Sequence, residues 1–392
     1  MSELTILHSV ERWLPQTQKW LHRLVTSLPS SIDYKVACRE SFNLESFRVP
    51  RLGVSETREN GLKRIRDLLN KMRMIPGLGR AVQRWDADRH VRWRLNFGQD
   101  ADLIHSHFGT IGWRDIAVAR RLSVPHVTSF YGYDCSYLPA RSPWWKGRYR
   151  RLFAEVDLVL CEGPHMKQRL VALGCPEDKI AVHHLGVDVQ SLPFAARCRQ
   201  PPDRAVRFLI ASAFKPKKGI PDAIDAFGEL KEELDFQVTI VGDSTSSRRS
   251  RNEKAKIRRK VHQHRLGERI EFLGFLPYHA LANCMLDHDI LVVPSRTSDH
   301  GDSEGGAPLT LVTAQATGMP VVSTTHADIP HVVVDGETGL LAAEGDSRSL
   351  ASKLRLAVND PQRWPVIGDA ARELVKEEFN AEVQAGRLTE HY

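Results

Sequence analysis

Short, continuous apolar runs alternate with helix-like stretches along the whole chain, and this pattern restricts the fold more than any other feature. In the first half the runs are "LTILHSV", "DYKVACRE", "DLIHSHFG", "PHVTSFYG", "VDLVLCEG" and "KIAVHHL", and in the second half they are "VRFLIAS", "FQVTIVGD", "RIEFLGFL", "DILVVPS", "PVVSTT" and "TGLLAA". Strands that are apolar throughout need helices on both faces, as in parallel sheets. The sequence therefore predicts an α/β protein with two doubly wound sheets.

A chain of 392 residues is too long for one ordinary core, so a boundary between two domains is expected. The polar, proline-bearing stretch "AARCRQPPDRA" marks it. We assign residues 1–195 to an N-terminal domain, 196–204 to a linker, 205–365 to a second domain, and 366–392 to a C-terminal helix that packs back on the first domain. Two such domains bind a ligand in a cleft facing the carboxyl ends of their strands.

Composition excludes several classes of protein. No apolar run approaches the roughly 20 residues of a membrane span. The N-terminus carries Glu3 and Glu11 where a signal peptide would be basic, which predicts a cytoplasmic chain. The six cysteines are scattered without a C-x-x-C pair, so neither a disulfide framework nor a zinc site is expected. The net charge of +7 divides into +11 for residues 1–200 and −4 for residues 201–392, which indicates an anionic partner for the first half.

The segment "SEGGAPLTLVTAQATGMPVVSTTHADIP" (residues 303–330) carries the chemistry. A helix over 308–317 is expected to begin at Pro308 and to end at Gly318, so Glu304, Gly305 and Gly306 lie between a strand's carboxyl end and a helix's amino end. Free amides there favour an anion such as a diphosphate, and a carboxylate can bind sugar hydroxyls. The alternative is an ordinary loop whose glycines serve only the turn.

This segment resembles the donor-sugar motif of retaining GT-B glycosyltransferases of family 4 (group 1), especially the lipopolysaccharide and exopolysaccharide type. The resemblance continues through "DLIHSHFG", "TSFYGYD", "VHHLGVDV", "KPKKGIPDAIDAF" and "IEFLGFLP". It implies two Rossmann-like domains facing a central cleft. It also implies a hexosyltransferase (EC 2.4 class) that moves a sugar from a UDP- or GDP-linked donor to a glycan or lipid-linked acceptor with retention, in cell-surface polysaccharide assembly. No cofactor and no metal are expected.

The resemblance also implies residue roles. Lys218 would stabilise the departing diphosphate as a catalytic cation, and Glu304 would hold the donor sugar. Further donor contacts are expected at Lys215, Lys217, Gly242, Gly305, Gly306, Ala307, Pro308 and Thr313. Asp299 and Asp302 flank the loop and imitate a metal pair, but we expect solvated acids there.

Two departures from the family pattern matter. Thr313 stands where relatives have a second glutamate for the ribose, and Ala213 stands where they have an arginine for the diphosphate. A hydrogen bond to a charged group contributes roughly 1.5–3 kcal/mol, so each loss costs about tenfold to a hundredfold. A transferase-like binding protein with impaired turnover is therefore one alternative. A GT-B nucleotide-sugar epimerase is another, although its acidic and histidine pattern is not evident.

In the N-terminal domain, Tyr131 and Gly132 follow a strand and are expected to face the cleft where many relatives have His-Gly. A tyrosine donates a hydrogen bond but is a poor base, and a packed aromatic is the alternative. His105 and His107 in "IHSHFG" are expected to point to opposite faces of a strand, so that at most one, His107, reaches the cleft. Their spacing does not indicate a metal site.

Basic segments with interleaved aromatics occur at residues 62–95 and 143–153, the second with Trp144, Trp145 and Tyr149. Such segments suit an anionic membrane surface, which predicts peripheral association with the inner face of the cell membrane. The alternative is a core-packed helix with a solvated charged face. Nucleic-acid binding is not expected because no motif accompanies the charge.

Overall fold

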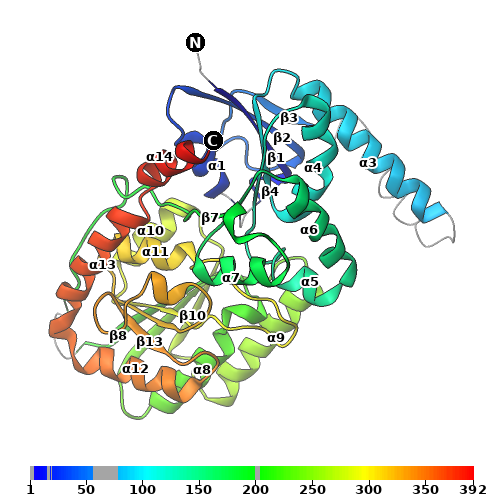
Figure 1. Cartoon of the computed structure of the whole chain (residues 1–392). Coiled ribbons are helices and arrows are strands. Elements are labelled where there is room, and N and C mark those ends of the chain that lie inside the picture. Colours follow the sequence, from blue (N-terminus) through cyan, green and yellow to red (C-terminus); the bar gives the residue numbers. More distant parts are fainter. Residues whose placement is uncertain (1–3, 16–17, 19, 56–77, 199–203) are drawn as a thin grey trace. The chain divides into compact units, whose positions relative to one another are not determined.

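The computed structural model describes residues 4–15, 18, 20–55, 78–198 and 204–392 (Figure 1). The chain divides into two compact units. The first comprises residues 1–161, 167–183 and 385–392, and the second comprises residues 162–166 and 184–384. Each unit is built around one parallel sheet, which confirms the predicted pair of doubly wound α/β domains.

The sheet of the first unit has the strand order β3-β2-β1-β4-β5-β6-β7, with every neighbouring pair parallel. Its strands are β1 (Leu4–Trp13), β2 (Ile32–Ser41), β3 (Leu52–Val54), β4 (Leu103–His107), β5 (His126–Ser129), β6 (Leu158–Cys161) and β7 (Ile180–Val182). The helices are α1 (Trp20–Thr26), α3 (Leu78–Phe97), α4 (Gly109–Leu122), α5 (Tyr137–Arg141), α6 (Pro143–Glu155) and α7 (Pro164–Ala172). The strand order reverses between β1 and β4.

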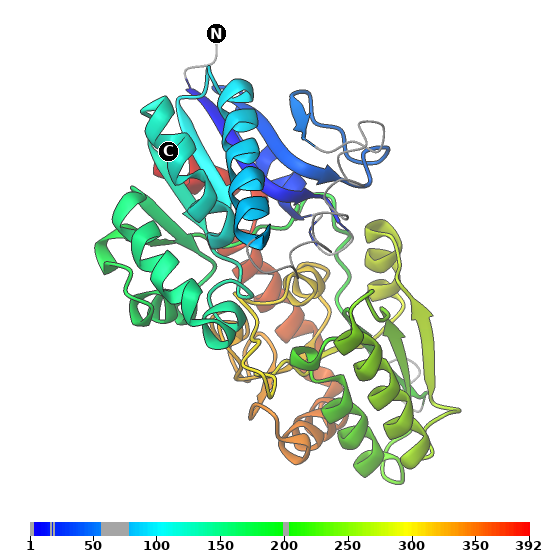
Figure 2. The same cartoon turned by 90° about the vertical axis from the view of Figure 1, so that its right-hand side faces the viewer.

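Alternate residues of β1 face opposite sides of this sheet, as the two-residue period of a strand requires. Leu7 packs with Ile104 and with the side chains of α3 and α4. Figure 2 shows α3 beside α4 on that side. Ile6 faces the other way and packs with Leu103 and with Leu388 of α14 (Ala381–His391).

The sheet of the second unit has the order β10-β9-β8-β11-β12-β13 and is also parallel. Its strands are β8 (Val206–Ala211), β9 (Phe236–Val241), β10 (Ile270–Gly274), β11 (Ile290–Val293), β12 (Val321–Thr324) and β13 (Leu340–Ala342). Its helices are α8 (Ile220–Leu230), α9 (Arg248–Gln263), α10 (Tyr278–Leu286), α11 (Leu309–Ala316), α12 (Ser347–Asn359) and α13 (Trp364–Glu378).

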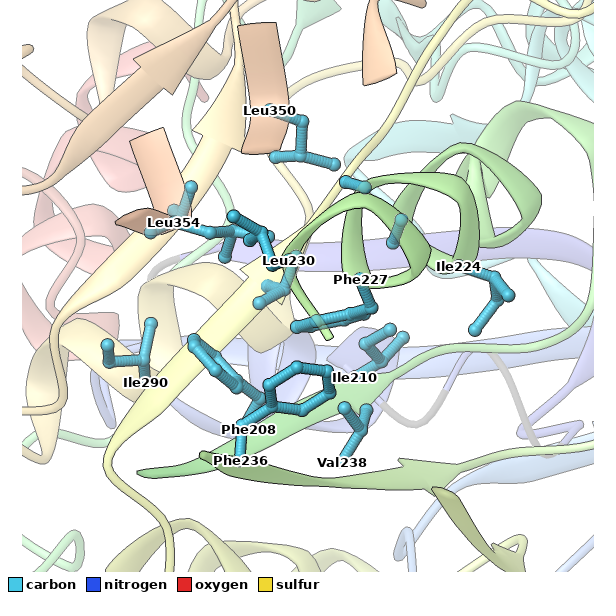
Figure 3. Close-up of a cluster of buried hydrophobic side chains, with 14 of the residues drawn as sticks. Phe208, Ile210, Ile224, Phe227, Leu230, Phe236, Val238, Ile290, Leu350 and Leu354 are labelled. Atoms are coloured by element: carbon cyan, nitrogen blue, oxygen red, sulfur yellow. The ribbon is translucent and has the colours of Figure 1, made fainter. Parts of the chain in front are cut away.

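Buried side chains on both faces explain why these strands are apolar throughout. Figure 3 shows one face, where Phe208 and Ile210 of β8 pack against Phe227 of α8 and against the leucines of α12. The intervening Leu209 packs on the other face, in a core built with α10, α11 and α13. Full burial of each large apolar side chain contributes about 1.5–3 kcal/mol.

The predicted boundaries need two corrections. The N-terminal part of the first unit ends at His183 and not at residue 195, because residues 184–198 pack with the second unit. Of the predicted linker, residues 199–203 lie outside the described part of the chain. The C-terminal segment 366–392 forms two helices, α13 and α14, because the chain bonds to Val187 between them: Val187 donates to the Phe379 carbonyl, and Ala381 donates to the Val187 carbonyl. The last residues, 385–392, belong to the first unit.

Among the described residues, no helix combines the length and the hydropathy needed to cross a membrane.

Candidate functional site

Two loops of the second unit meet at the carboxyl ends of β8 and β11, where the strand order of its sheet reverses. Such a switch point is the usual ligand site of a doubly wound sheet. The loop after β8 carries Lys215 and a 3₁₀ turn over Pro216–Lys218, and the Arg296 amide of the loop after β11 donates to the Lys217 carbonyl at 2.8 Å. Gly219, with φ +61°, allows this approach because a Cβ there would lie 1.7 Å from the Pro294 carbonyl oxygen.

Lys217, Lys218, Asp302 and Glu304 form what we call the lysine–carboxylate cluster. Lys218 Nζ lies 2.7 Å from Glu304 Oε1, and Lys217 Nζ lies 3.6 Å from Glu304 Oε2 and 3.4 Å from Asp302 Oδ1. Glu304 is only 8% exposed. Burial alone would raise the pKa of Glu304, but the charges of Lys218 and Lys217 outweigh it and lower the pKa to about 2. The two predicted catalytic residues thus form an ion pair in which Glu304 is buried and Lys218 is partly exposed.

His326 and Glu344 support this cluster, and sequence reasoning missed both. The Glu304 amide donates to His326 Nε2 at 3.1 Å, while His326 Nδ1 lies 2.9 Å from Glu344 Oε2. Since the Glu344 carboxylate only accepts, His326 carries its proton on Nδ1 and orients the Glu304 backbone. The available signal was a histidine in "STTHADIP", just past a strand that ends beside the glutamate loop.

The predicted anion-binding amides already contact an acidic side chain. The Gly306 amide donates to a carboxylate oxygen of Glu162, and a Cβ at Gly306 would lie 2.5 Å from the Glu162 Cβ. A negatively charged oxygen therefore fits against this loop when residue 306 is glycine. The helix α11 begins at Leu309, one position after the predicted start, so Pro308 is its N-cap residue, and Gly318 follows the helix with φ +75°, as expected.

Thr313 does not present its hydroxyl as expected. The side chain is 3% exposed, and its Oγ1 donates to the Leu309 carbonyl at 2.7 Å. A threonine hydroxyl within a helix reaches the carbonyl one turn back, and this bond uses its only proton. Toward a ligand, the Thr313 hydroxyl can therefore only accept a hydrogen bond.

Further candidates of this unit lie on the loops after β8, β9 and β11. Gly242, with φ +132°, lets the chain pass Ser212, whose carbonyl oxygen would lie 1.9 Å from a Cβ. Lys215 makes no ion pair with any residue that the structure describes, and burial, together with the charges of Lys217 and Lys218, lowers its pKa. Asp302 faces Lys217, while the exposed Asp299 pairs with Arg296.

In the first unit, Tyr131 Oη lies 2.7 Å from His107 Nδ1, and its ring packs on Trp20 and Phe108. The expectation that His105 and His107 face opposite sides of a strand is wrong, because residues two apart share a face. Both are fully buried, and their ring centroids lie 4.3 Å apart. The spacing of these two histidines does not by itself indicate a metal site, but His8 joins them, and one ring nitrogen of each lies within 4.8 Å of the others.

Two parallel doubly wound sheets, with a lysine–carboxylate cluster at the switch point of the second, define a GT-B glycosyltransferase fold. Solved structures agree: a crystal structure of Anabaena Alr3699/HepE in complex with UDP and glucose has a TM-score of 0.79 at 17% identity and covers 99% of both chains. The apo lipopolysaccharide outer core galactosyltransferase WaaB has a TM-score of 0.70 at 12% identity, with 98% of both chains covered.

The chain belongs to the group 1 glycosyltransferases. The model of "Glycosyl transferases group 1" matches residues 199–374, and that of "Glycosyltransferase Family 4" matches residues 18–191. WcaL of Escherichia coli K12, whose name assigns it to colanic acid biosynthesis, is 34% identical over 289 residues, covering 72% of this chain and 68% of WcaL. The amylovoran biosynthesis glycosyltransferase AmsK of Erwinia amylovora is 32% identical over 297 residues, covering 74% and 69%.

Proposed function

We propose that this glycosyltransferase moves a hexose from a UDP- or GDP-linked donor to a glycan or lipid-linked acceptor, with retention, during exopolysaccharide assembly. The names of WcaL and AmsK support the pathway, and the UDP and glucose bound to HepE support the kind of donor. The observation that carries the proposal is the ion pair of Lys218 with the buried Glu304, on the loop that also holds the Gly306 amide, at the switch point of the second sheet.

The reaction breaks the bond between the anomeric carbon and the diphosphate, and the acceptor oxygen forms a new bond to the same carbon while losing its proton. Negative charge grows on the leaving phosphate oxygen, and fixed cations stabilise it. Lys218 supplies one cation. When it turns to the phosphate, Glu304 is released to accept hydrogen bonds from the donor sugar hydroxyls, while Lys217 still neutralises it at 3.6 Å.

Lys215 offers a second cation in place of the arginine that Ala213 replaces. It is the lysine of this loop that forms no ion pair with the described residues, so no carboxylate has to be displaced when a diphosphate binds. This arrangement favours an active transferase over a protein that only binds nucleotide sugars.

We propose that turnover at this site needs no metal ion. Phosphate-bound Mg²⁺ normally takes one or two carboxylates as ligands. Here Asp302 and Glu304 are paired with lysines, and Asp299 is exposed beside Arg296. Added Mg²⁺ is expected to leave the rate unchanged, and a strict requirement for Mg²⁺ would contradict this assignment.

The experiment that tests the function compares binding with turnover. Calorimetric titration of UDP and GDP identifies the base, and donor hydrolysis with the matching nucleotide sugars measures turnover without knowledge of the acceptor. We expect one of the two nucleotides to bind. We also expect the matching nucleotide sugar to be hydrolysed to the free sugar and the nucleoside diphosphate. Tight binding without turnover for every donor would favour the alternative, a binding protein with impaired turnover.

An anionic membrane is the partner that we propose for the first unit. Trp144 of α6 is 78% exposed, and the Arg148 guanidinium stacks on Trp113 and Trp145 at 4.4 and 4.9 Å. A cavity of about 400 Å³ beside them is lined by Arg121 and Arg151, which form no ion pair within the described ranges. Tyr149 is fully buried and takes no part in this surface. Exposed aromatics beside basic groups suit a lipid interface.

Sedimentation with vesicles tests this surface. Anionic vesicles should carry the protein down at low salt and release it at high salt, whereas neutral vesicles should not. Trp144→Ala should weaken the binding, while Val366→Ala, which truncates an exposed apolar side chain of the second unit, should not. The absence of pelleting at low salt would contradict the proposal.

A further inference from the structure

Three buried histidines lie together at the switch point of the first sheet, outside the lysine–carboxylate cluster. His8 on β1 and His105 on β4 are register partners, and His107 follows two residues later on the same face of β4. All three side chains are fully buried, and the ring centroids of His8 lie 5.3 Å from those of both other rings. No function assigned above uses this cluster of imidazoles.

One ring nitrogen of the three histidines makes no hydrogen bond within the described part of the chain. His8 Nδ1 lies 3.0 Å from His107 Nε2, and His107 Nδ1 lies 2.7 Å from the Tyr131 hydroxyl. Within the described part of the chain, His8 Nε2 has no hydrogen-bond partner. If that nitrogen carried a proton, a buried donor would be unsatisfied, so the favoured tautomer places the proton on His8 Nδ1. His8 Nε2 is then a free lone pair in a buried position.

Both ring nitrogens of His105 lie within hydrogen-bond distance of hydroxyl groups. Its Nδ1 lies 2.6 Å from the Tyr392 hydroxyl and its Nε2 lies 2.7 Å from the Ser129 hydroxyl. A neutral imidazole has one proton, so one of its nitrogens accepts from a hydroxyl that can rotate away. Histidines that bind metals characteristically use one nitrogen for the ion and give the other to a polar group that fixes the ring. Tyr131 and one of the two hydroxyls at His105 are placed for that purpose, and His107 Nε2 becomes available to an ion once it gives up its hydrogen bond from His8 Nδ1.

We propose that His8, His105 and His107 bind a divalent transition metal, with Zn²⁺ as the ion that a set of neutral imidazoles suits best. One nitrogen of each ring lies within 4.8 Å of the others. Zn–N bonds of about 2.0–2.1 Å in a tetrahedron place ligand atoms roughly 3.4 Å apart. Rotation of the side chains therefore has to bring the ligand nitrogens about 1 Å closer to one another. Three histidines leave a fourth position for water.

The protonation state of the rings agrees with this assignment. Burial lowers the pKa of His8 to about 3 and also lowers the pKa values of His105 and His107, so all three are neutral at neutral pH. Neutral imidazole is the form that binds metals, so little proton release opposes binding. A bound ion would join β1 to β4 and fix the Tyr131 hydroxyl through His107.

Metal analysis of the full chain tests the proposal. Protein stripped with a chelator is dialysed against Zn²⁺ or Co²⁺, and bound metal is measured by mass spectrometry. We expect an equimolar amount of metal and the visible absorption bands of tetrahedral Co²⁺. His8→Gln and His107→Gln each remove one ligand and should weaken binding at least about tenfold, as losses at such sites do.

His126→Gln is the matched control. His126 is also a buried histidine of this sheet, but it bonds to Ser106 on the opposite face. Its variant should retain the metal. Sub-stoichiometric metal in the wild type, or equal loss in the control, would overturn the proposal. If circular dichroism shows that the His8 and His107 variants fail to fold, X-ray absorption of the Zn²⁺-loaded wild type decides, since imidazole scattering supports the site and sulfur or oxygen ligation alone refutes it.

Discussion

Removal of the Lys218 ammonium is the sharpest test of the lysine–carboxylate cluster. In Lys218→Ala, Glu304 loses the 2.7 Å contact at Oε1 and keeps the Lys217 ammonium, 3.6 Å from Oε2, and the Ser295 hydroxyl, 3.2 Å from Oε1. A hydrogen bond between charged groups contributes roughly 1.5–3 kcal/mol, so the loss of the Lys218–phosphate contact in the transition state lowers kcat/KM by about tenfold to a hundredfold. The pKa of Glu304, which the two lysines hold at about 2, should rise.

The assay follows donor hydrolysis or transfer over a range of donor concentrations, so that kcat and KM are obtained separately. Lys353→Ala is the control, because Lys353 also pairs with a carboxylate, Asp335, but lies on α12 and not on the loops after β8 and β11. A loss in kcat indicates a contact made in the transition state, and a loss in KM alone indicates ground-state binding. An unchanged kcat/KM in Lys218→Ala would remove this residue from the mechanism.

Three further changes probe other parts of the structure. Gly306→Ala should weaken nucleotide binding, because its Cβ would lie 2.5 Å from the Glu162 Cβ, while Gly267→Ala, which meets nothing within 4 Å, should not; equal effects in calorimetry would contradict this. Thr313→Glu should destabilise the protein by about 1–3 kcal/mol without tightening UDP binding, because a buried carboxylate replaces a hydroxyl that has a hydrogen-bond partner. Tighter UDP binding would show that a side chain at position 313 can contact the ribose. Burial and the charge of Arg94 lower the pKa of His90 to about 4, so the unfolded chain binds more protons and stability falls as the pH drops from about 6.5 to 4. His90→Gln should reduce that fall by up to about 1.4 kcal/mol per pH unit in urea unfolding, and a steeper fall in the variant would refute the assignment.

The pairing of Lys218 with Glu304 was predictable because it depends only on strand order. Loops that follow the two strands at a switch point meet at one edge of the sheet, whatever their detailed paths. The support from His326 was not predictable in the same way. A single histidine after a strand carries no periodic signal, and its value depends on the turn that directs Nε2 toward the Glu304 amide.

Thr313 and the histidine cluster show two different limits. A threonine at that place in α11 can turn its hydroxyl outward or back to the preceding turn, and only packing decides between them. For the histidines, the two-residue period of a strand places His105 and His107 on one face, and the prediction of opposite faces was wrong. The contribution of His8 requires the pairing of β1 with β4 and its register, and that of Tyr392 requires contact across 287 residues of sequence.

Ala213 and Thr313 raise the question of whether this chain has lost the charges that a donor site needs. The lysines of the loop after β8 argue against it. Lys217 and Lys218 pair with the carboxylates of Asp302 and Glu304, whereas Lys215 forms no ion pair within the described ranges. An incoming diphosphate can therefore bind Lys215 without displacing a carboxylate, and Lys215, repelled by its two lysine neighbours in the free protein, gains from the arrival of a dianion. We therefore propose that the cation for the diphosphate lies at position 215 in this chain and not at position 213.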